Sequence, residues 1–234
     1  MSDDHGDPYD DVSVVMITRN EEGAVAKVIK EAQAALPGAE VFVIDGSDDA
    51  TPELAREAGA IVVREPGGGF GPAFHAALMT PERPIIVTVD ADDTYPPSVY
   101  PVLVALVRSG WDIAGTDRLG ARPPKTMPLG NWIANQIFSW TASVRVRRRL
   151  KDVHSGQRAY TRDVVHAFDW DFAGKAFPVD LVMWPAAKGY RVIDIPIEYA
   201  ERIGETTLDR WPSGKATLQR LFRPGSQIRL RGTR

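Results

Sequence analysis

Short apolar segments alternate with helix-like segments along the first hundred residues. The apolar, largely β-branched segments cover residues 12–18, 41–44, 61–63 and 85–89. Between them, apolar residues recur at helical spacing, as in Val25, Val28 and Ile29, and predict helices after residue 23, from Thr51 and over residues 72–79. We expect Thr51 to cap its helix, with Pro52 in the first turn. This alternation predicts a mostly parallel sheet with right-handed crossovers, flanked by helices.

The second half continues the pattern with longer segments. We predict a helix from Pro97 to residue 109, a strand over 112–116, a mobile loop over 117–128, a helix over 176–188 and a strand over 190–199. One helical face between residues 129 and 144 carries Leu129, Trp132, Ile133, Gln136, Ile137, Trp140 and Val144. Apolar faces normally pack on a core, which is the expectation here. The four arginines within residues 145–149 leave a membrane-surface contact as the alternative.

The length of 234 residues is enough for one large domain. We predict an α/β domain over residues 11–200, a disordered acidic lead-in over 1–10 and a basic loop or tail with a short helix over 201–234. No stretch reaches the roughly 18 to 20 apolar residues that span a bilayer. A cytoplasmic location is therefore the expectation, with peripheral contact at the inner face of the membrane as an option. The absence of cysteine excludes disulfides and thiolate zinc sites.

Charge is distributed unevenly along the chain. Residues 1–100 carry 19 acidic and 6 basic side chains, whereas residues 101–234 carry 12 acidic and 22 basic ones. An acidic half that could hold a cation, followed by a basic half, suits an anionic ligand lying between them. No nucleic-acid-binding module accompanies the basic residues, so we expect no nucleic-acid partner.

Polar side chains follow three of the predicted strands. Arg19, Asn20 and Glu21 follow the first strand, Asp45 ends the second, and Asp90 and Asp92 end the fourth. Ligands of open α/β sheets bind outside the carboxyl ends of the strands, so these side chains should meet in one crevice. Neither a Gly-x-Gly-x-x-Gly sequence after the first strand nor a P-loop is present.

The acidic strand end at residues 90–93 predicts a metal site. Carboxylates crowded at one strand end repel each other unless they share a cation, and Mg²⁺ or Mn²⁺ suits hard oxygen ligands. Mg²⁺ commonly binds one or two carboxylates together with substrate phosphates, which favours a diphosphate ligand. The alternative is an acidic turn that caps the helix near Pro97.

Several motifs together resemble a known family. Residues 18–22 (TRNEE), 45–51 (DGSDDAT) and 90–92 (DAD) are similar to those of family-2 inverting glycosyltransferases with the GT-A fold, a Rossmann-like nucleotide-diphospho-sugar transferase fold. Residues 152–160 (DVHSGQRAY) and 202–208 (RIGETTL) resemble elements of the polyprenyl-phosphate glycosyltransferases, including dolichyl-phosphate mannose synthase. Gln157 and Thr207 depart from the Phe and Lys usual in these elements, and the membrane-spanning part of some relatives is absent. These departures concern the identity of the acceptor more than membership of the family.

The resemblance implies roles for particular residues. It implies a metal held by Asp90, Asp92 and Thr94, with Asp92 as the direct ligand at the catalytic centre, and Asp152 as the carboxylate of the acceptor site. Residues implied at the nucleotide or donor are Ile17, Arg19, Glu21, Asp45, Asp90, Ala91 and Arg118. Arg158 and Arg202 are implied at the acceptor or its phosphate. Each has a structural alternative: an Asx turn with Ser47 for Asp45, a helix cap for Thr94, a buried contact for Asp152.

The predicted activity is metal-dependent, inverting transfer of a sugar from a nucleoside-diphosphate sugar, with Mg²⁺ or Mn²⁺ as cofactor. The resemblance implies a polyprenyl phosphate as the preferred acceptor. A phosphate monoester is largely ionised near neutral pH, so such an acceptor needs no general base. A hydroxyl acceptor would need one, and Asp152 is then the candidate, ahead of His154. A catalytically inactive nucleotide-sugar-binding protein is the alternative from another class, and a nucleotidyltransferase fits poorly.

Overall fold

A seven-stranded sheet forms the centre of the protein in the computed structural model, which describes residues 7–120, 122–200, 210–223 and 229–231. The strand order is β3-β2-β1-β4-β6-β5-β8. β6 is antiparallel to both of its neighbours, and the other neighbouring pairs are parallel. The predicted mostly parallel sheet is therefore confirmed. The strands of this sheet are β1 (Val12–Thr18), β2 (Glu40–Asp45), β3 (Ile61–Arg64), β4 (Ile85–Thr88), β5 (Ile113–Asp117), β6 (Arg158–Thr161) and β8 (Val192–Pro196).

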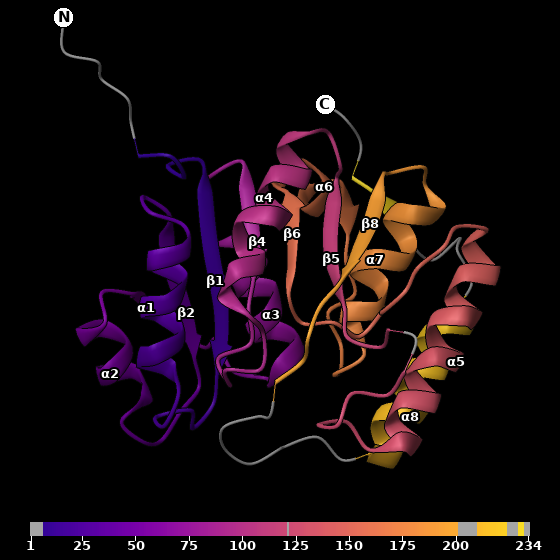
Figure 1. Ribbon diagram of the computed structural model, residues 1–234, viewed down its shortest axis with the longest axis horizontal. Coiled ribbons are helices and arrows are strands. Elements are labelled where there is room, and N and C mark those ends of the chain that lie inside the picture. Colours follow the sequence, from indigo (N-terminus) through magenta and orange to yellow (C-terminus); the bar gives the residue numbers. More distant parts are fainter. Residues whose placement is uncertain (1–6, 121, 201–209, 224–228, 232–234) are drawn as a thin grey trace, which may run out of the picture.

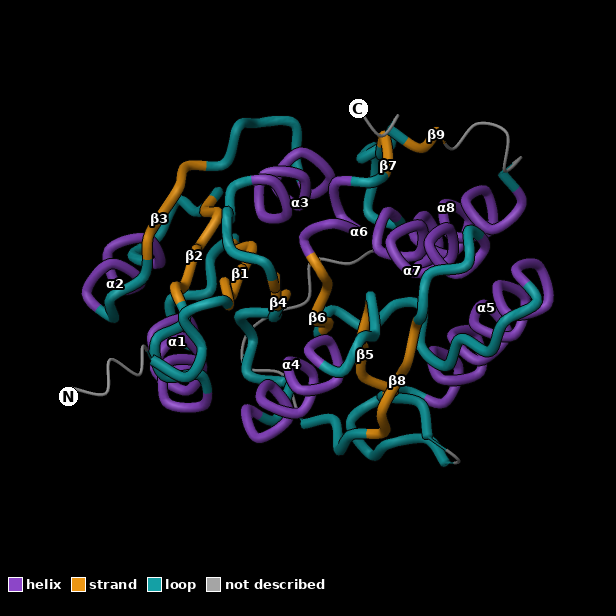
Figure 2. The backbone as a smooth tube through the Cα atoms, turned by 90° about the horizontal axis from the view of Figure 1, so that it is seen from above, coloured by secondary structure: helices purple, strands orange, loops and turns teal. Residues whose placement is uncertain are grey.

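Helices cover both faces of this sheet (Figures 1 and 2). They are α1 (Val25–Ala35), α2 (Thr51–Glu57), α3 (Phe70–Met79), α4 (Tyr100–Arg108), α5 (Leu129–Val146), α6 (Arg162–His166), α7 (Phe177–Ala187) and α8 (Arg210–Phe222). A 3₁₀ turn, η1 (Pro97–Val99), precedes α4, and β7 (Phe168–Asp169) pairs with β9 (Arg229–Leu230) in a small second sheet.

The alternation of side chains along the strands builds two hydrophobic layers. Val14 and Met16 of β1 point into the layer that packs on α1 and α4, and Val15 points into the layer with α3 and α7. Both faces of the central strands are thus covered, which explains their continuous apolar sequences. In Figure 2, α1 and α4 lie on one side of the sheet, and α3, α6 and α7 lie on the other.

The described residues near both ends of the chain make tertiary contacts. Residues 7–10 belong to the expected disordered lead-in, yet the Tyr9 N–H donates to the Pro37 carbonyl and the Arg108 guanidinium donates to the Pro8 carbonyl. In the expected basic tail, α8 is a 13-residue helix that packs against α5 and α7 and buries Leu221. A short helix was expected in this region, and tertiary packing stabilises it at this length despite its polar composition.

The predicted burial of the α5 apolar face was wrong. Leu129, Ile133, Ile137, Trp140 and Val144 are all exposed. The core-facing side of α5 instead carries small residues, and Ser139 and Ala142 are the buried positions of the helix. Helical spacing identifies which residues share a face, but it does not reveal which face meets the core.

Two further local expectations were corrected. Thr51 does not cap α2 with its side chain; its hydroxyl donates to Asp49 Oδ1 and accepts the Glu21 N–H at 2.9 Å. The sequence also gave no sign of β6, a four-residue strand inserted antiparallel between β4 and β5. The Glu21 contact of Thr51 and the pairing of β6 both depend on partners that are distant in the sequence.

Candidate functional site

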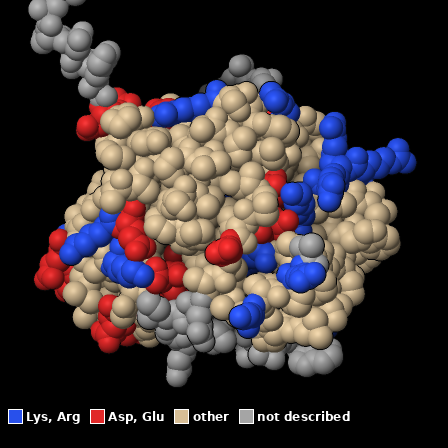
Figure 3. Space-filling model, in the orientation of Figure 1, with Lys and Arg blue, Asp and Glu red and all other residues tan. Residues whose placement is uncertain are grey.

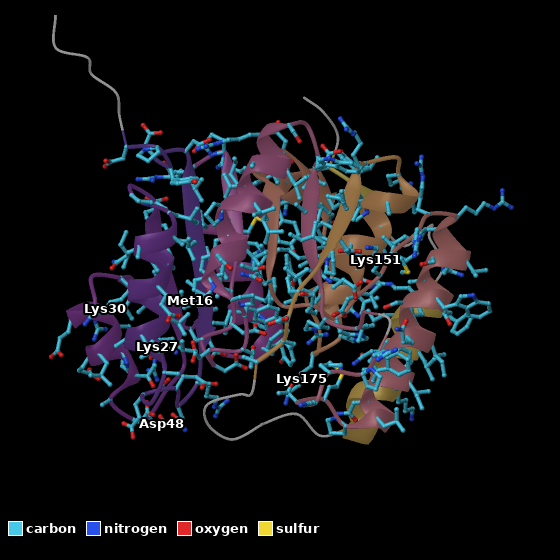
Figure 4. All side chains as sticks on the ribbon, in the orientation of Figure 1. Met16, Lys27, Lys30, Asp48, Lys151 and Lys175 are labelled. Carbon is cyan, nitrogen blue, oxygen red and sulfur yellow. The ribbon has the colours of Figure 1, made fainter. Side chains whose placement is uncertain are left out.

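The carboxyl ends of β1, β2 and β4 lie side by side along one edge of the sheet. Thr18 pairs with Asp45 across β1 and β2, and β4 runs parallel to β1 on the other side. This edge is the lower one in Figure 1, and Asp48, just beyond β2, lies there in Figure 4. The predicted convergence of the polar strand ends is confirmed for these three strands.

Asp45 is buried and held by its neighbours. Its Oδ1 accepts the hydroxyls of Thr18 at 2.8 Å and Ser47 at 2.6 Å, and its Oδ2 accepts the Ser47 N–H at 3.3 Å. The Asx turn that the sequence offered as a structural alternative is therefore present. The Arg64 guanidinium lies 3.7 Å from Oδ2, so the carboxylate also has a cation beside it.

The loops after β1 and β2 are hydrogen-bonded to each other. Asn20 adopts a left-handed conformation with φ 59°; its N–H donates to the Ser47 hydroxyl at 2.8 Å, and its Oδ1 accepts the Asp48 N–H at 3.0 Å. These bonds fix the backbone next to Arg19, which is exposed, and Glu21, which is half-buried. Ile17, another predicted donor residue, is half-buried near the end of β1.

Asp90 lies against a glycine from the second half of the chain. The residue is exposed just after β4, while the adjacent Ala91 is buried. A Cβ atom added at Gly156 would come within 2.3 Å of Asp90 Oδ2 and 2.5 Å of Oδ1. The absence of a side chain at Gly156 is thus what allows the carboxylate to take this position.

Asp92 is buried and oriented by Thr94. Its Oδ1 accepts the Thr94 hydroxyl at 2.7 Å and the Thr94 N–H at 3.2 Å. Asp93 points elsewhere: its backbone has φ 64°, and its carboxylate forms an ion pair with Lys27 of α1, which Figure 4 labels. Asp90 and Asp92 are therefore the pair in the DAD sequence that fits a cation, and Thr94 is placed to orient Asp92.

A cation at this position would need further ligands. Within the described ranges 7–120, 122–200, 210–223 and 229–231, no group of three His, Cys, Asp or Glu side chains could hold a metal by itself. Two carboxylates completed by the oxygens of a diphosphate match the usual coordination of Mg²⁺. The donor set at Asp90 and Asp92 fits such a shared site.

Arg118 and Asp152 form a bidentate ion pair beside these strand ends. Arg118 Nε donates to Asp152 Oδ2 at 2.7 Å, Nη2 donates to Oδ1 at 3.0 Å, and the backbone N–H of Arg118 adds a bond of 3.2 Å to Oδ2. Burial by itself raises the pKa of Asp152, but the charge and hydrogen bonds of Arg118 bring that pKa below its usual value. Asp152 is 0% exposed and engaged on both oxygens, which favours positioning of Arg118 over removal of a proton from an acceptor.

Arg158, predicted to bind phosphate, is part of the protein interior. The residue is 1% exposed, its Nη2 donates to the main-chain carbonyl of Asp152 at 2.8 Å, and it belongs to the antiparallel strand β6. The Arg158 side chain packs beside Gly115 on β5, where an added Cβ would lie 2.6 Å from Asp194 Oδ1 and 3.3 Å from Arg158 Cγ. Enclosure of this guanidinium favours a structural role for Arg158, and its predicted contact with phosphate stays a prediction. Arg202, the other predicted phosphate ligand, lies outside the described residues.

His154 is placed as a structural residue. Its Nε2 lies 3.0 Å from the Thr217 hydroxyl of α8, and its ring contacts that of Phe138. Burial lowers the pKa of His154 to about 4, so the imidazole is neutral near pH 7.

Sequence reasoning missed two tyrosines at this site. The Tyr95 hydroxyl accepts the Gly156 N–H at 2.8 Å, and its ring packs against that of Tyr199 with centroids 5.5 Å apart. The Arg118 guanidinium lies over the Tyr199 ring, 5.4 Å from its centroid. Tyr95 thus links the loop after β4 to the loop before β6, and no local sequence signal identifies such a contact.

Comparison with known proteins identifies the relatives of this chain. A sequence model described as "Glycosyl transferase family 2" matches residues 13–167. A "Dolichyl-phosphate hexose transferase" of Haloferax volcanii is 38% identical over 224 residues, which are 95% of this chain and 97% of the relative. An "Undecaprenyl-phosphate mannosyltransferase" of Micrococcus luteus is 28% identical and covers 95% of this chain and 97% of its own length.

Solved structures share the fold. Glucosyl-3-phosphoglycerate synthase from Mycobacterium tuberculosis, in complex with Mn²⁺, uridine diphosphate and phosphoglyceric acid, matches with a TM-score of 0.71. The match covers 94% of this chain and 85% of that structure at 18% sequence identity. The sheet order, the strand-end carboxylates and this match agree with the expected GT-A fold.

Proposed function

The chain belongs to glycosyl transferase family 2, and from this premise we propose that it transfers a hexose, with inversion, from a nucleoside-diphosphate sugar to a polyprenyl phosphate. Relatives that match over nearly their whole length are named for hexose or mannose transfer to dolichyl or undecaprenyl phosphate. Their names support this acceptor class.

The observation that carries the proposal is the pair of carboxylates after β4. Asp90 is exposed against Gly156, and Asp92 is oriented by Thr94. In our proposal, these two carboxylates hold Mg²⁺ or Mn²⁺ together with the diphosphate of the donor. The cation would stabilise the negative charge that develops on the leaving diphosphate. Thr94 acts through Asp92, because its hydroxyl and N–H both bond to Oδ1.

The nucleotide would bind over the ends of β1 and β2. Asp45 can accept hydrogen bonds from base N–H or ribose hydroxyl groups with the capacity left on Oδ2. Arg19 and Glu21 follow β1 at the same edge, Ile17 lies near the end of β1, and Ala91 lies in the loop after β4. The cross-bonds between Asn20, Ser47 and Asp48 hold this surface in place before a ligand arrives, which lowers the entropy cost of binding.

The acceptor would approach beside Arg118. A phosphate monoester carries most of its second negative charge near pH 7, because its second pKa is about 6. Its oxygen can therefore attack the anomeric carbon without losing a proton, and the carbon–oxygen bond to the diphosphate breaks as the new bond forms. This fits the engagement of both Asp152 oxygens by Arg118. Arg118 is 12% exposed and can offer its charge to a phosphate.

The test uses the whole chain, Mn²⁺ or Mg²⁺, and radiolabelled nucleoside-diphosphate hexoses that differ in base and sugar. A thermal-shift screen of the corresponding nucleoside diphosphates first selects the base, since a bound ligand stabilises the fold by mass action. Label is then partitioned between organic and aqueous phases after incubation with polyprenyl phosphate. Label in the organic phase supports the proposal. Transfer confined to a water-soluble hydroxyl compound contradicts the acceptor, and nucleotide binding without any transfer or donor hydrolysis indicates an inactive binding protein.

A further inference from the structure

The helices α5 and α8 present an unusual apolar surface to solvent. Seven of the ten exposed large hydrophobic residues in the described ranges 7–120, 122–200, 210–223 and 229–231 lie on these two helices. We call this set the exposed apolar face: Leu129, Ile133, Ile137, Trp140 and Val144 of α5, with Leu218 and Phe222 of α8. Trp140 is 68% exposed and Phe222 64%. Contiguous apolar surface of this kind marks an interaction site.

Each of these two helices turns a set of apolar side chains toward solvent. The five residues of α5 follow one another at intervals of three or four positions, so they form one stripe along the helix. The opposite side of α5 already packs on the protein through Ser139 and Ala142. In α8, Leu221 and Thr217 are buried while Leu218 and Phe222 face solvent. Because α5 and α8 pack against each other, their exposed residues extend one surface.

The two segments that carry this face are basic, although Arg220 and Arg223 of α8 are paired with Asp180 and Asp171 from outside them. Residues 118–151 contain eight Lys or Arg and no Asp or Glu, and residues 210–234 contain seven Lys or Arg and no Asp or Glu. Arg147, Arg148 and Arg149 are exposed at the end of α5. On the side drawn in Figure 3, red atoms gather mainly at the left and centre, whereas the right-hand edge, where α5 lies in Figure 1, is tan and blue.

We propose that the exposed apolar face of α5 and α8 docks on a bilayer surface containing anionic lipid. Helices with large apolar and aromatic residues on one face and basic residues beside them lie in the membrane interface. A single arginine near an anionic leaflet strengthens binding about fivefold. A second copy of this chain is a poorer occupant, because pairing the face with itself would bring like charges together. Among the described residues, no helix is long and apolar enough to cross a membrane, so this contact lies at the surface.

The face is connected to the candidate site through α5. Trp132 Nε1 donates to the Leu119 carbonyl at 2.6 Å, and Gln136 Nε2 donates to the Gly120 carbonyl at 3.3 Å. These bonds tie the first turns of α5 to the segment directly after Arg118. Docking therefore brings the loop that carries Arg118 toward the bilayer. This part of the inference rests on the proposed function, since a polyprenyl phosphate would present its phosphate at that surface.

The experiment measures binding of the full chain to vesicles of phosphatidylcholine alone and of phosphatidylcholine mixed with phosphatidylglycerol. The variant I137Q/W140Q removes apolar contact without changing charge, and the matched control I61Q/V102Q changes two exposed apolar residues on β3 and α4. We expect the wild-type protein to bind the anionic vesicles, with an affinity that falls at high salt. The affinity of I137Q/W140Q should be lower by at least about tenfold, and that of the control should equal the wild-type value. The variant R147Q/R148Q/R149Q should bind the anionic vesicles less tightly and lose most of the preference over neutral ones.

A second measurement separates docking from catalysis. Transfer to a short-chain, water-soluble prenyl phosphate should proceed in I137Q/W140Q as in the wild type, while transfer to a long-chain acceptor in vesicles falls. Vesicle binding by a wild-type protein that transfers no sugar would overturn the proposed function and leave docking intact. Docking itself is overturned if the wild type binds no vesicles, if I137Q/W140Q binds them equally well, or if the face proves to be a dimer contact in sedimentation.

Discussion

Arg118 and Asp152 face each other with two parallel N–H···O bonds, of 2.7 and 3.0 Å, although 34 positions separate them in the sequence. Arg118 follows β5, and Asp152 lies in the segment between α5 and β6. The pair therefore joins two segments that only the insertion of β6 next to β5 brings together. The carboxylate is fully buried, both of its oxygens accept from Arg118, and Oδ1 also accepts the His154 N–H at 3.1 Å, so these surroundings favour a role in positioning Arg118.

The substitution Asp152→Asn should destabilise the protein. It leaves the largely buried Arg118 charge without its counter-ion, which typically costs about 3–5 kcal/mol of unfolding free energy. Urea unfolding measures this loss, with Asp169→Asn as a control at an exposed acidic position. A double variant that also replaces Arg118 by Met should be less destabilised than the sum of the two single changes. Unchanged stability in Asp152→Asn, combined with loss of turnover, would instead support the general-base role.

The metal prediction concerns Asp92. Asp92→Asn keeps the hydrogen bonds from Thr94 available but removes a charge from the candidate cation site. We expect kcat to fall roughly 100-fold or more while the thermal unfolding temperature stays close to that of the wild type. Treatment with EDTA should abolish transfer, and added Mn²⁺ or Mg²⁺ should restore it. Undiminished turnover in EDTA would remove the metal from the proposal.

Gly156→Ala tests the position of Asp90. The added Cβ would lie 2.3–2.6 Å from atoms of the Asp90 carboxyl group, so the carboxylate must move. A displacement of this size should weaken Mn²⁺-dependent nucleotide binding and lower turnover by about 10- to 100-fold. Gly130→Ala in α5 is the control, because its Cβ would meet no atom within 4 Å. Calorimetric titration with the nucleoside diphosphate, with and without Mn²⁺, distinguishes the two variants. Equal nucleotide affinities of Gly156→Ala and Gly130→Ala would show that binding does not require the observed position of Asp90.

Asp194 should make stability depend on pH. Burial raises the pKa of this carboxyl group from 3.8 to about 6, against the opposing effects of the Lys151 N–H and Arg158. The folded protein therefore binds this proton more tightly than the unfolded chain. Its contribution to stability is fully present below pH 4 and is lost as the pH rises through 6, in total roughly 2–3 kcal/mol.

The substitution Asp194→Asn isolates this effect. Burial lowers the pKa of His154 to about 4, which acts in the opposite direction over the same range, so the variant and the wild type are compared at each pH. Between pH 4 and 7, the unfolding free energy of the wild type should fall relative to that of Asp194→Asn. A constant difference across this range would show that Asp194 does not change its ionisation there.

Much of the fold follows from local sequence patterns. The β-branched segments, the helical spacing and the turn residues between them predict the parallel strands β1, β2, β3, β4, β5 and β8 and most of the helices, because each signal involves residues a few positions apart. The acids at the ends of β2 and β4 follow for the same reason: once the strands are parallel, their carboxyl ends share one edge. Asp45, Asp90 and Asp92 could thus be assigned to one site from the sequence alone.

Tertiary structure decided which of the second-half charges stay accessible beside this edge of the sheet. Arg118 and Arg158 are alike in sequence terms, but the antiparallel β6 encloses Arg158 beside Gly115, whereas Arg118 stays at the rim on Asp152. The stripe of α5 is evident from its spacing, yet its exposure follows from the small residues Ser139 and Ala142 that meet the protein instead. Burial and ion pairing depend on neighbours tens of residues away. Those neighbours set the free energy of burying a charge or an apolar face. The local sequence therefore determined the sheet and its acidic edge, and long-range packing determined which charges and apolar faces remain available at the surface.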